Sequence, residues 1–350
     1  MPNELRRDYV LDRSSIIASA RSGRPHDYGL SFSTLKGETS VSCPFCPGNE
    51  ERTPPADLLL VRCKGDTVYE RDIGKKRRRD WLVRSFPNFY PAVEPKINPL
   101  PRSDSFCHSQ PSYGHHEVVV ESPNHDEHPG VARVEQLEFS LRTEFLLADS
   151  FYKDERIKYV QVFRNHRKEA GASLSHAHSQ VIALDSVPKL VREELEGYRR
   201  HNIAHGDCVY CRILEKEQDG PRMVFKDRDF LVIAPWASIT PFELWILPRH
   251  HESNALKTSE TMISGLAKAL RLTLGALSKL LGDPPYNYGI HTIPSSPEIT
   301  DYHWHVEILP RLSVWAGFEL STGMYINTTP PELAAISLRD RVKQELESLD

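Results

Sequence analysis

Apolar residues recur at helical spacing in two stretches of the chain. The first apolar face would consist of Val134, Leu137, Leu141 and Phe145. The second stretch follows Ser259, a residue type that caps helix N-termini, and it stops at a Gly-Asp-Pro sequence that begins at Gly282. Its apolar positions are Met262, Leu266, Leu270, Leu274, Leu277 and Leu281. The pattern predicts two long amphipathic helices.

Strand-like patterns surround both helices in the same order. An apolar run that ends in proline and histidine precedes each helix, and two further β-type runs follow it. The last run of each set begins with His-x-His, in HAHSQVIAL and in HWHVEILP. The predicted strand segments are residues 115–125, 157–165 and 176–184 around the first helix, and 241–251, 286–293 and 303–310 around the second.

The two sets are related by a nearly constant offset. Pro123 and Pro248 are 125 residues apart, and His176 and His303 are 127 residues apart. Equivalent features at one offset indicate an internal repeat. We predict an α+β fold of two tandem halves, each an antiparallel sheet with a long helix packed on it. The predicted halves are residues 1–198 and 199–350, with a linker near residues 199–207.

The composition is that of a soluble globular protein, with 350 residues of which 39% are hydrophobic and 26% charged. The net charge of −4 gives no overall attraction to nucleic acid or to a membrane surface. The sequence shows neither a membrane-spanning run nor the apolar core of a signal peptide, so we expect a cytoplasmic protein. The basic run KKRRR at residues 75–79 predicts a solvated loop, with a phosphate-binding patch as the alternative.

Four of the six cysteines form two CxxC pairs, Cys43 with Cys46 and Cys208 with Cys211. In a reducing compartment such pairs indicate metal or redox chemistry more often than disulfides. Prolines beside the first pair favour a turn over the strand–helix junction of a redox motif, so we interpret both pairs as half of a Zn²⁺ site.

The segment GASLSHAHSQVIAL places His176, His178 and Gln180 on one side of a strand, because alternate residues of a strand face the same way. His125 and His176 are the natural ligands to complete the first site as Cys₂His₂. By analogy, the second site would use Cys208, Cys211, His303 and either His250 or His251. We therefore predict two closed zinc sites that hold structure.

His178 is left over by this metal assignment. An imidazole can attack phosphorus and form a covalent phosphoramidate. The turn at Gly171 and Ser173 offers backbone N–H groups and a hydroxyl to phosphate oxygens. Gln180 can donate a hydrogen bond but cannot act as an acid, which suits a phosphate leaving group. The second half has Glu307 in the place of Gln180, so we expect one working site and one mainly structural copy.

These residues resemble the histidine-triad superfamily and, within it, the galactose-1-phosphate uridylyltransferase family, which carries His-x-His-x-Gln. The resemblance covers nearly the whole chain. The segments that carry it are RSGRPHDY (21–28), SCPFCPG, VRSFPNFYPA (83–92), ESPNH, Asn165 to Ser173, HAHSQ, APW…PFELWILP and HWHVEILP.

The resemblance implies a role for each matching position. His178 would carry the nucleotidyl group, and Gln180 would stabilise that intermediate. Asn165 and Ser173 would contact phosphate, in an Asn-x₅-Gly-x-Ser segment that includes Gly171. The remaining implied residues are Arg21 and Arg24 near the substrate phosphates, Asn88 in the nucleoside pocket, and Cys43, Cys46, His125 and His176 at zinc.

Two segments depart from the pattern of the uridylyltransferases. Leu174-Ser175 stands where that family usually has Asn-Pro, and residues 317–332 lack its Glu-Thr-Gln-Arg-Asp stretch. Both departures resemble the ADP-glucose phosphorylase branch. The implied activity is two-step transfer of NMP from UDP-glucose or ADP-glucose to a hexose 1-phosphate or phosphate, in a chain that could form a homodimer.

Two other classes remain as alternatives. A histidine-triad nucleotide hydrolase would use water as the acceptor, and Gln180 in place of a third histidine argues against it. A non-enzymatic zinc module that binds nucleic acid would want a basic surface, and the net acidity argues against that.

Overall fold

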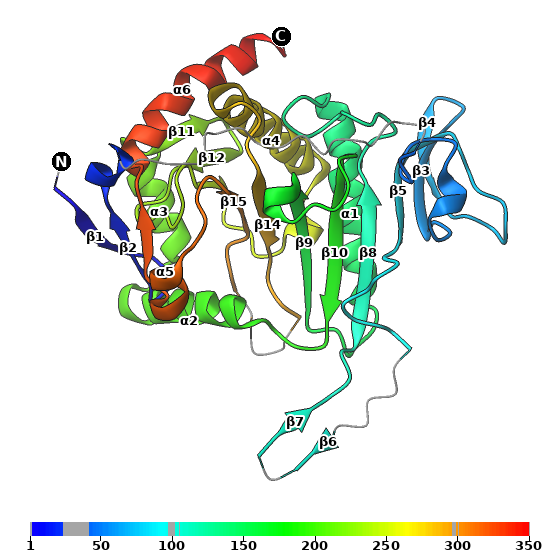
Figure 1. The fold of residues 1–350 in the computed structure, drawn as a ribbon, viewed down its shortest axis with the longest axis horizontal. Helices are drawn as coiled ribbons and strands as arrows, with labels where there is room; N and C mark the ends of the chain where they lie inside the picture. Colours follow the sequence, from blue (N-terminus) through cyan, green and yellow to red (C-terminus); the bar gives the residue numbers. More distant parts are fainter. Residues whose placement is uncertain are drawn as a thin grey trace.

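The computed structural model describes residues 2–23, 42–96, 102–104, 106–295, 299 and 301–349. Its centre is an eleven-stranded antiparallel sheet with the order β11-β12-β13-β15-β14-β9-β10-β8-β5-β3-β4 (Figure 1). The strands are β3 (Leu58–Cys63), β4 (Asp66–Glu70), β5 (Trp81–Pro87), β8 (Gly114–Val120), β9 (Tyr159–His166), β10 (His178–Leu184), β11 (Met223–Lys226), β12 (Phe230–Ile233), β13 (Leu244–Pro248), β14 (Tyr286–His291) and β15 (His305–Pro310).

The two predicted sheets form one continuous sheet. Strand β9 of the first half pairs with β14 of the second, and Asn165 lies opposite Asn287 in that pairing. The sequence repeat predicts the strands of each half but not this junction. The α+β class with long helices packed on antiparallel strands is confirmed.

Helices α1 (Val134–Phe151) and α4 (Glu260–Leu281) are the two helices that the sequence predicts. They pack against each other and against the sheet, and their apolar residues form the largest core cluster. Ser259 caps α4 by accepting a hydrogen bond from the Met262 N–H at 3.3 Å, and Gly282 ends it with a φ of 74°. The sequence signals therefore predict both ends of this helix correctly.

The N-terminal residues cross over to the second half. Strand β1 (Glu4–Arg7) pairs with β2 (Ser14–Ile17), and β2 pairs with β16 (Tyr325–Asn327) near the end of the chain. Residues 4–17 therefore pack with the second half, although they precede the first half in sequence (Figure 1). The division at residue 198 stays a prediction.

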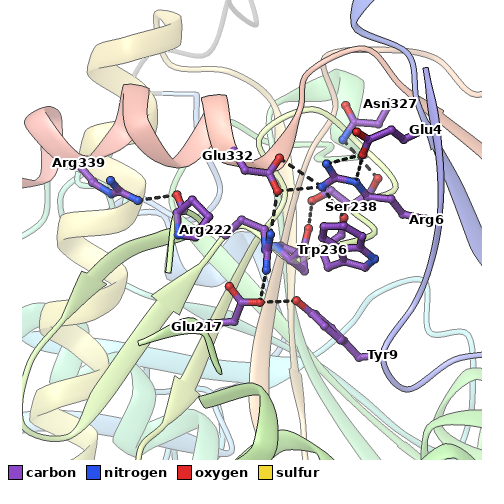
Figure 2. A network of polar contacts seen from close by, with 12 residues as sticks. Glu4, Arg6, Tyr9, Glu217, Arg222, Trp236, Ser238, Asn327, Glu332 and Arg339 are labelled. Atoms are coloured by element: carbon purple, nitrogen blue, oxygen red, sulfur yellow. Dashed lines mark hydrogen bonds and ion pairs between the residues drawn. The ribbon is translucent and has the colours of Figure 1, made fainter. Parts of the chain in front are cut away.

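A buried ionic network holds this crossover in place (Figure 2). Arg6 and Arg222 both bind Glu332, at 3.0 Å and 2.8 Å, and Arg222 also binds Glu217 at 2.5 Å. The two guanidinium groups also make cation–π contacts with one ring, since both lie over Trp236, at 3.9 Å and 4.9 Å from its centroid. The network therefore connects β1 to α6 (Pro331–Glu347) and to Arg222 and Glu217, all of which belong to the second half.

The remaining elements are short or peripheral. The expected linker coincides largely with the last turns of α2, and the KKRRR run lies in the loop between β4 and β5. Among the helices of the described residues, none combines the length and apolar character that a membrane span requires. The elements not yet described are α2 (Lys189–His205), α3 (Val209–Glu217), α5 (Gly317–Thr322), η1 (Ser19–Gly23), η2 (Glu50–Arg52), η3 (Lys168–Ala170), η4 (Ala255–Lys257), β6 (Arg102–Ser103) and β7 (His108–Ser109).

Candidate active site and metal centres

The first predicted metal group comes together in the structure. Cys43, Cys46, His125 and His176 each place a ligand atom within 4.8 Å of the others. The Nδ1 atom of His176 is 3.6 Å from Cys43 Sγ and 3.4 Å from Cys46 Sγ, and His125 Nδ1 is 3.3 Å from Cys46 Sγ. A tetrahedral Zn²⁺ places sulfur and nitrogen ligands about 3.5 Å apart, so the donor set and its spacing fit that ion.

Outer hydrogen bonds fix both histidines of this centre. His176 Nε2 donates to the Ser122 carbonyl at 2.8 Å, which leaves the lone pair on Nδ1, where a metal would bind. His125 Nε2 lies 2.9 Å from Ser175 Oγ. Four protein ligands complete a tetrahedron, so this centre leaves no position for a substrate.

The second group consists of Cys208, Cys211, His251 and His303, again within 4.8 Å. The structure thus selects His251 over His250. His303 Nδ1 is 3.7 Å from Cys208 Sγ and 3.6 Å from Cys211 Sγ, and His251 Nδ1 is 3.4 Å from Cys211 Sγ. The pKa of Cys211 falls to about 4 because it accepts a hydrogen bond from Cys208 and contacts His303. A thiolate of this kind is the form that binds metal.

His178 is the first residue of β10 and is 6% exposed. Its Nδ1 donates to the His176 carbonyl at 2.8 Å, so the neutral ring carries its lone pair on Nε2. The Phe45 ring meets the imidazole edge to face, with the centroids 5.3 Å apart. Because His176 is also a predicted metal ligand, the first metal centre and the orientation of His178 depend on the same residue.

Arg164 contacts the backbone of His178 and was not predicted from the sequence. It forms a buried ion pair with Glu121 and donates to the His178 carbonyl at 3.0 Å. Burial opposes the charge on Arg164, but Glu121 outweighs that effect and raises its pKa. Arg164 therefore stays charged at neutral pH and holds the start of β10 through this hydrogen bond.

Gln180 follows His178 on the same side of β10 and is half-exposed. Its Oε1 lies 2.8 Å from Nε2 of His116 on the neighbouring strand β8. His116 was not predicted as a site residue, because it is the second histidine of the apolar run HHEVVV and matches no motif. Only the strand register, which pairs His116 with Ile182, brings it beside Gln180.

The predicted phosphate-side residues lie around the turn after β9. Gly171 has a φ of 92°, which favours glycine, and a Cβ there would come within 3.7 Å of Asn165 Nδ2. Ser173 is exposed two residues later. Asn287 of β14 donates to Asn165 Oδ1 at 2.8 Å and to the Ala170 carbonyl at 2.7 Å. The second half thus contributes a residue to this site, which the sequence repeat did not predict.

The other predicted substrate residues are less constrained. Asn88 follows β5, and its Nδ2 lies 3.1 Å from His116 Nε2, so it borders the Gln180 contact. Arg21 lies in η1 and is exposed. Arg24 lies outside the described residues, so the basic pair stays a prediction.

The counterpart of His178 in the second half is His305, at the start of β15. Its Nδ1 also contacts the preceding His-x-His carbonyl, His303 O, at 3.1 Å. However, His305 is 0% exposed and packs against the rings of Tyr210 and His291. His291 and Glu194 beside it form a buried ion pair at 3.0 Å. A substrate would have to displace core residues to reach His305.

We therefore expect His305→Ala to leave covalent nucleotide labelling close to the wild-type level. The loss of a buried ring would instead lower the melting temperature. Labelling with radioactive nucleotide sugar, beside a thermal melt, checks both results. Loss of labelling in a folded His305→Ala protein would show that the active half is wrongly assigned.

Two family models match this chain, over ranges that overlap. Residues 71–188 match the model "Galactose-1-phosphate uridyl transferase, N-terminal domain", and residues 131–350 match "Domain of unknown function (DUF4921)". An ADP-glucose phosphorylase of Arabidopsis thaliana is 33% identical over 347 residues, which cover 96% of this chain and 92% of that protein. This chain belongs to the galactose-1-phosphate uridylyltransferase family.

Other members of the family agree. A galactose-1-phosphate uridylyltransferase of Thermotoga maritima is 26% identical over 96% of this chain and 98% of its own length. The crystal structure of an Arabidopsis thaliana ADP-glucose phosphorylase with bound ADP-glucose matches with a TM-score of 0.81 at 32% identity, covering 97% of this chain and 99% of that one. A solved uridylyltransferase matches with a TM-score of 0.74 at 30% identity, covering 97% and 99%. The protein is an enzyme, a nucleotidyltransferase of this family.

Proposed function

We propose that this enzyme transfers a nucleoside monophosphate in two displacements through His178. The observation that supports this most directly is the hydrogen bond from His178 Nδ1 to the His176 carbonyl, because it keeps the lone pair on Nε2. In the first step, Nε2 attacks the α-phosphorus of a nucleotide sugar. A P–N bond forms, the bond to the bridging oxygen breaks, and the sugar 1-phosphate leaves with the electron pair. In the second step, an acceptor phosphate oxygen displaces Nε2.

ADP-glucose is the donor and inorganic phosphate the acceptor that we propose. The support is the higher identity to ADP-glucose phosphorylase than to the Thermotoga maritima uridylyltransferase, 33% against 26%, together with the ADP-glucose in the similar crystal structure. The products would be glucose 1-phosphate and ADP. UDP-glucose with a hexose 1-phosphate acceptor is the pair that would replace them if the base is uracil.

We also propose that both Cys₂His₂ groups hold Zn²⁺ and that neither ion takes part in the reaction. When bound, the ions would pin the CxxC turns to the sheet. Nδ1 and Sγ of the ligand residues would hold them, and His176 would orient His178 through its carbonyl. Cytoplasmic location, a homodimer and the absence of nucleic-acid and membrane partners stay predictions.

The function is tested by incubating the enzyme separately with ADP-glucose and UDP-glucose, each labelled in the base. The protein is then denatured and the bound label counted. Exchange is followed separately, as transfer of label from labelled glucose 1-phosphate into unlabelled nucleotide sugar with no other acceptor present. Trapped nucleotide and exchange support the proposal, and the labelling nucleotide identifies the donor. Steady release of free NMP, with no trapped species and no exchange, would make the enzyme a hydrolase.

Gln180→Ala is expected to slow transfer without abolishing it. The variant would lose one hydrogen bond to a charged phosphoryl group, which costs about 1.5–3 kcal/mol, or roughly ten- to a hundredfold in rate. Single-turnover formation of labelled enzyme measures this step. An unchanged rate in a folded variant would show that Gln180 does not contact the phosphoryl group.

A further inference from the structure

His116 connects three parts of the candidate site. Its Nε2 lies 2.8 Å from Gln180 Oε1 and 3.1 Å from Asn88 Nδ2, and its Nδ1 accepts from the Ala92 backbone N–H at 3.1 Å. Strand β8 carries it on the same face of the sheet as Gln180. The residue touches no predicted metal ligand in these contacts, so its role concerns the reaction side of the site.

The proton on His116 can be placed from its partners. A backbone N–H can only donate, so Nδ1 must be the acceptor and the single proton of the neutral ring lies on Nε2. Burial lowers the pKa of His116, which favours this neutral form at pH 7. Asn88 Oδ1 already accepts from the Tyr90 N–H at 2.9 Å, so the Asn88 amide turns its Nδ2 toward His116 and offers Nε2 no acceptor. The 3.1 Å approach of Asn88 Nδ2 to Nε2 is therefore a contact between two donors and not a hydrogen bond. The acceptor for the Nε2 proton is therefore Gln180 Oε1.

This bond decides which way the Gln180 amide faces. An amide has an oxygen on one branch and an NH₂ group on the other. With the oxygen held by His116, the NH₂ branch is the one left to meet a phosphoryl group on His178. The reversed amide would direct its oxygen at anionic phosphoryl oxygens. It would also leave the Nε2 proton of His116 without an acceptor, because both Asn88 and Gln180 would then present N–H groups to it.

We propose that His116 is a positioning residue that holds the Gln180 amide with its N–H groups toward the nucleotidyl intermediate. The inference rests on the proposed function and adds a residue to it. His116 acts only through Gln180, so its removal slows the chemical step and leaves substrate affinity unchanged. A merely structural role, anchoring the Ala92 backbone, is the competing explanation.

Two substitutions separate the two contacts of this ring. The amide nitrogen of a glutamine lies as many bonds from Cβ as Nε2 does, so His116→Gln keeps a donor for Gln180 and loses the Ala92 contact. The amide of an asparagine lies at the level of Nδ1, so His116→Asn keeps the Ala92 contact and loses the donor. Positioning predicts that His116→Asn is the slow variant, whereas anchoring predicts that it is His116→Gln.

The experiment measures the single-turnover rate and KM for labelling with ADP-glucose, or with UDP-glucose if that donor labels the wild type. His116→Asn should be roughly three- to tenfold slower, the range for a neutral hydrogen bond, with KM unchanged. His116→Gln should keep most of the rate. In a Gln180→Ala background, His116→Asn should have no further effect.

Each other outcome has a definite meaning. A wild-type rate in His116→Asn, a slower His116→Gln than His116→Asn, or additive losses in the double variant overturns the positioning role while the two-step function stands. A wild type that traps no nucleotide overturns the proposed function and this inference with it. Thermal melts of all variants show whether a lost rate is a lost fold.

Discussion

His178→Ala is expected to leave no measurable covalent nucleotide and no measurable transfer. The substitution removes Nε2, the atom that we propose forms the new bond to phosphorus, and the methyl group left behind cannot replace it. Gln180 and the Asn165 turn would still bind the donor, so substrate affinity should survive where the rate does not. The measurement is retention of labelled nucleotide on denatured protein, with exchange of labelled glucose 1-phosphate into the nucleotide sugar as the second readout.

The matched control is His305→Ala, which removes the equivalent side chain of the second half. Both histidines bond a carbonyl of their own His-x-His strand through Nδ1, so the two substitutions make similar local changes. A His178→Ala protein that is folded and still becomes labelled would contradict the assignment. Label found on another residue would mean that a different nucleophile does this work.

The sequence predicts those parts of the site that depend on local spacing. The CxxC pairs and His-x-His strands recur with the repeat, and the structure brings Cys43, Cys46, His125 and His176 together as one group. Both signals are local. A CxxC pair places two thiols close together, and alternation along a strand places every second side chain on one face. The helix of residues 260–281 was predictable for the same reason, since its cap and its terminal glycine adjoin it.

Residues that act across the sheet could not be predicted this way. Asn287 reaches Asn165 only because β14 pairs with β9, and that pairing joins segments more than a hundred residues apart. His116 depends in the same way on the register between β8 and β10. A single sequence contains no periodic signal for strand order between the halves, so a side chain that serves the neighbouring strand looks like an ordinary polar residue.

Burial, as well as the sequence motif, supports the assignment of the reaction to the first half. Both histidines begin their strands, but His178 keeps 6% exposure beside a half-exposed Gln180, whereas His305 is fully buried among aromatic rings and Glu307 is buried. We therefore propose that the second copy of the pattern serves the fold and a metal group and takes no part in the reaction. Asn287 shows that the second half also supports the site directly.

Cys43→Ser is expected to lower the free energy of unfolding by on the order of 3 kcal/mol or more and to reduce the zinc content from two ions per chain toward one. Serine is a poor ligand for Zn²⁺, and Cys43 and His176 are both buried, so three ligands would hold the ion weakly and the turn would come loose from the sheet. Elemental analysis of protein purified without added metal, followed by chemical denaturation, measures both quantities.

The same substitution separates a structural zinc from a catalytic one. The closed Cys₂His₂ group has no position for a substrate, so the folded fraction of Cys43→Ser protein should still form covalent nucleotide, though more slowly because His176 no longer holds His178 as firmly. Cys63→Ser, which removes an exposed single thiol, is the control and should match the wild type in zinc content, stability and rate. If folded, zinc-depleted Cys43→Ser protein forms no covalent nucleotide while it still binds the donor, the ion takes part in the chemistry. If it keeps two zinc ions and melts like the wild type, Cys43 is not a ligand.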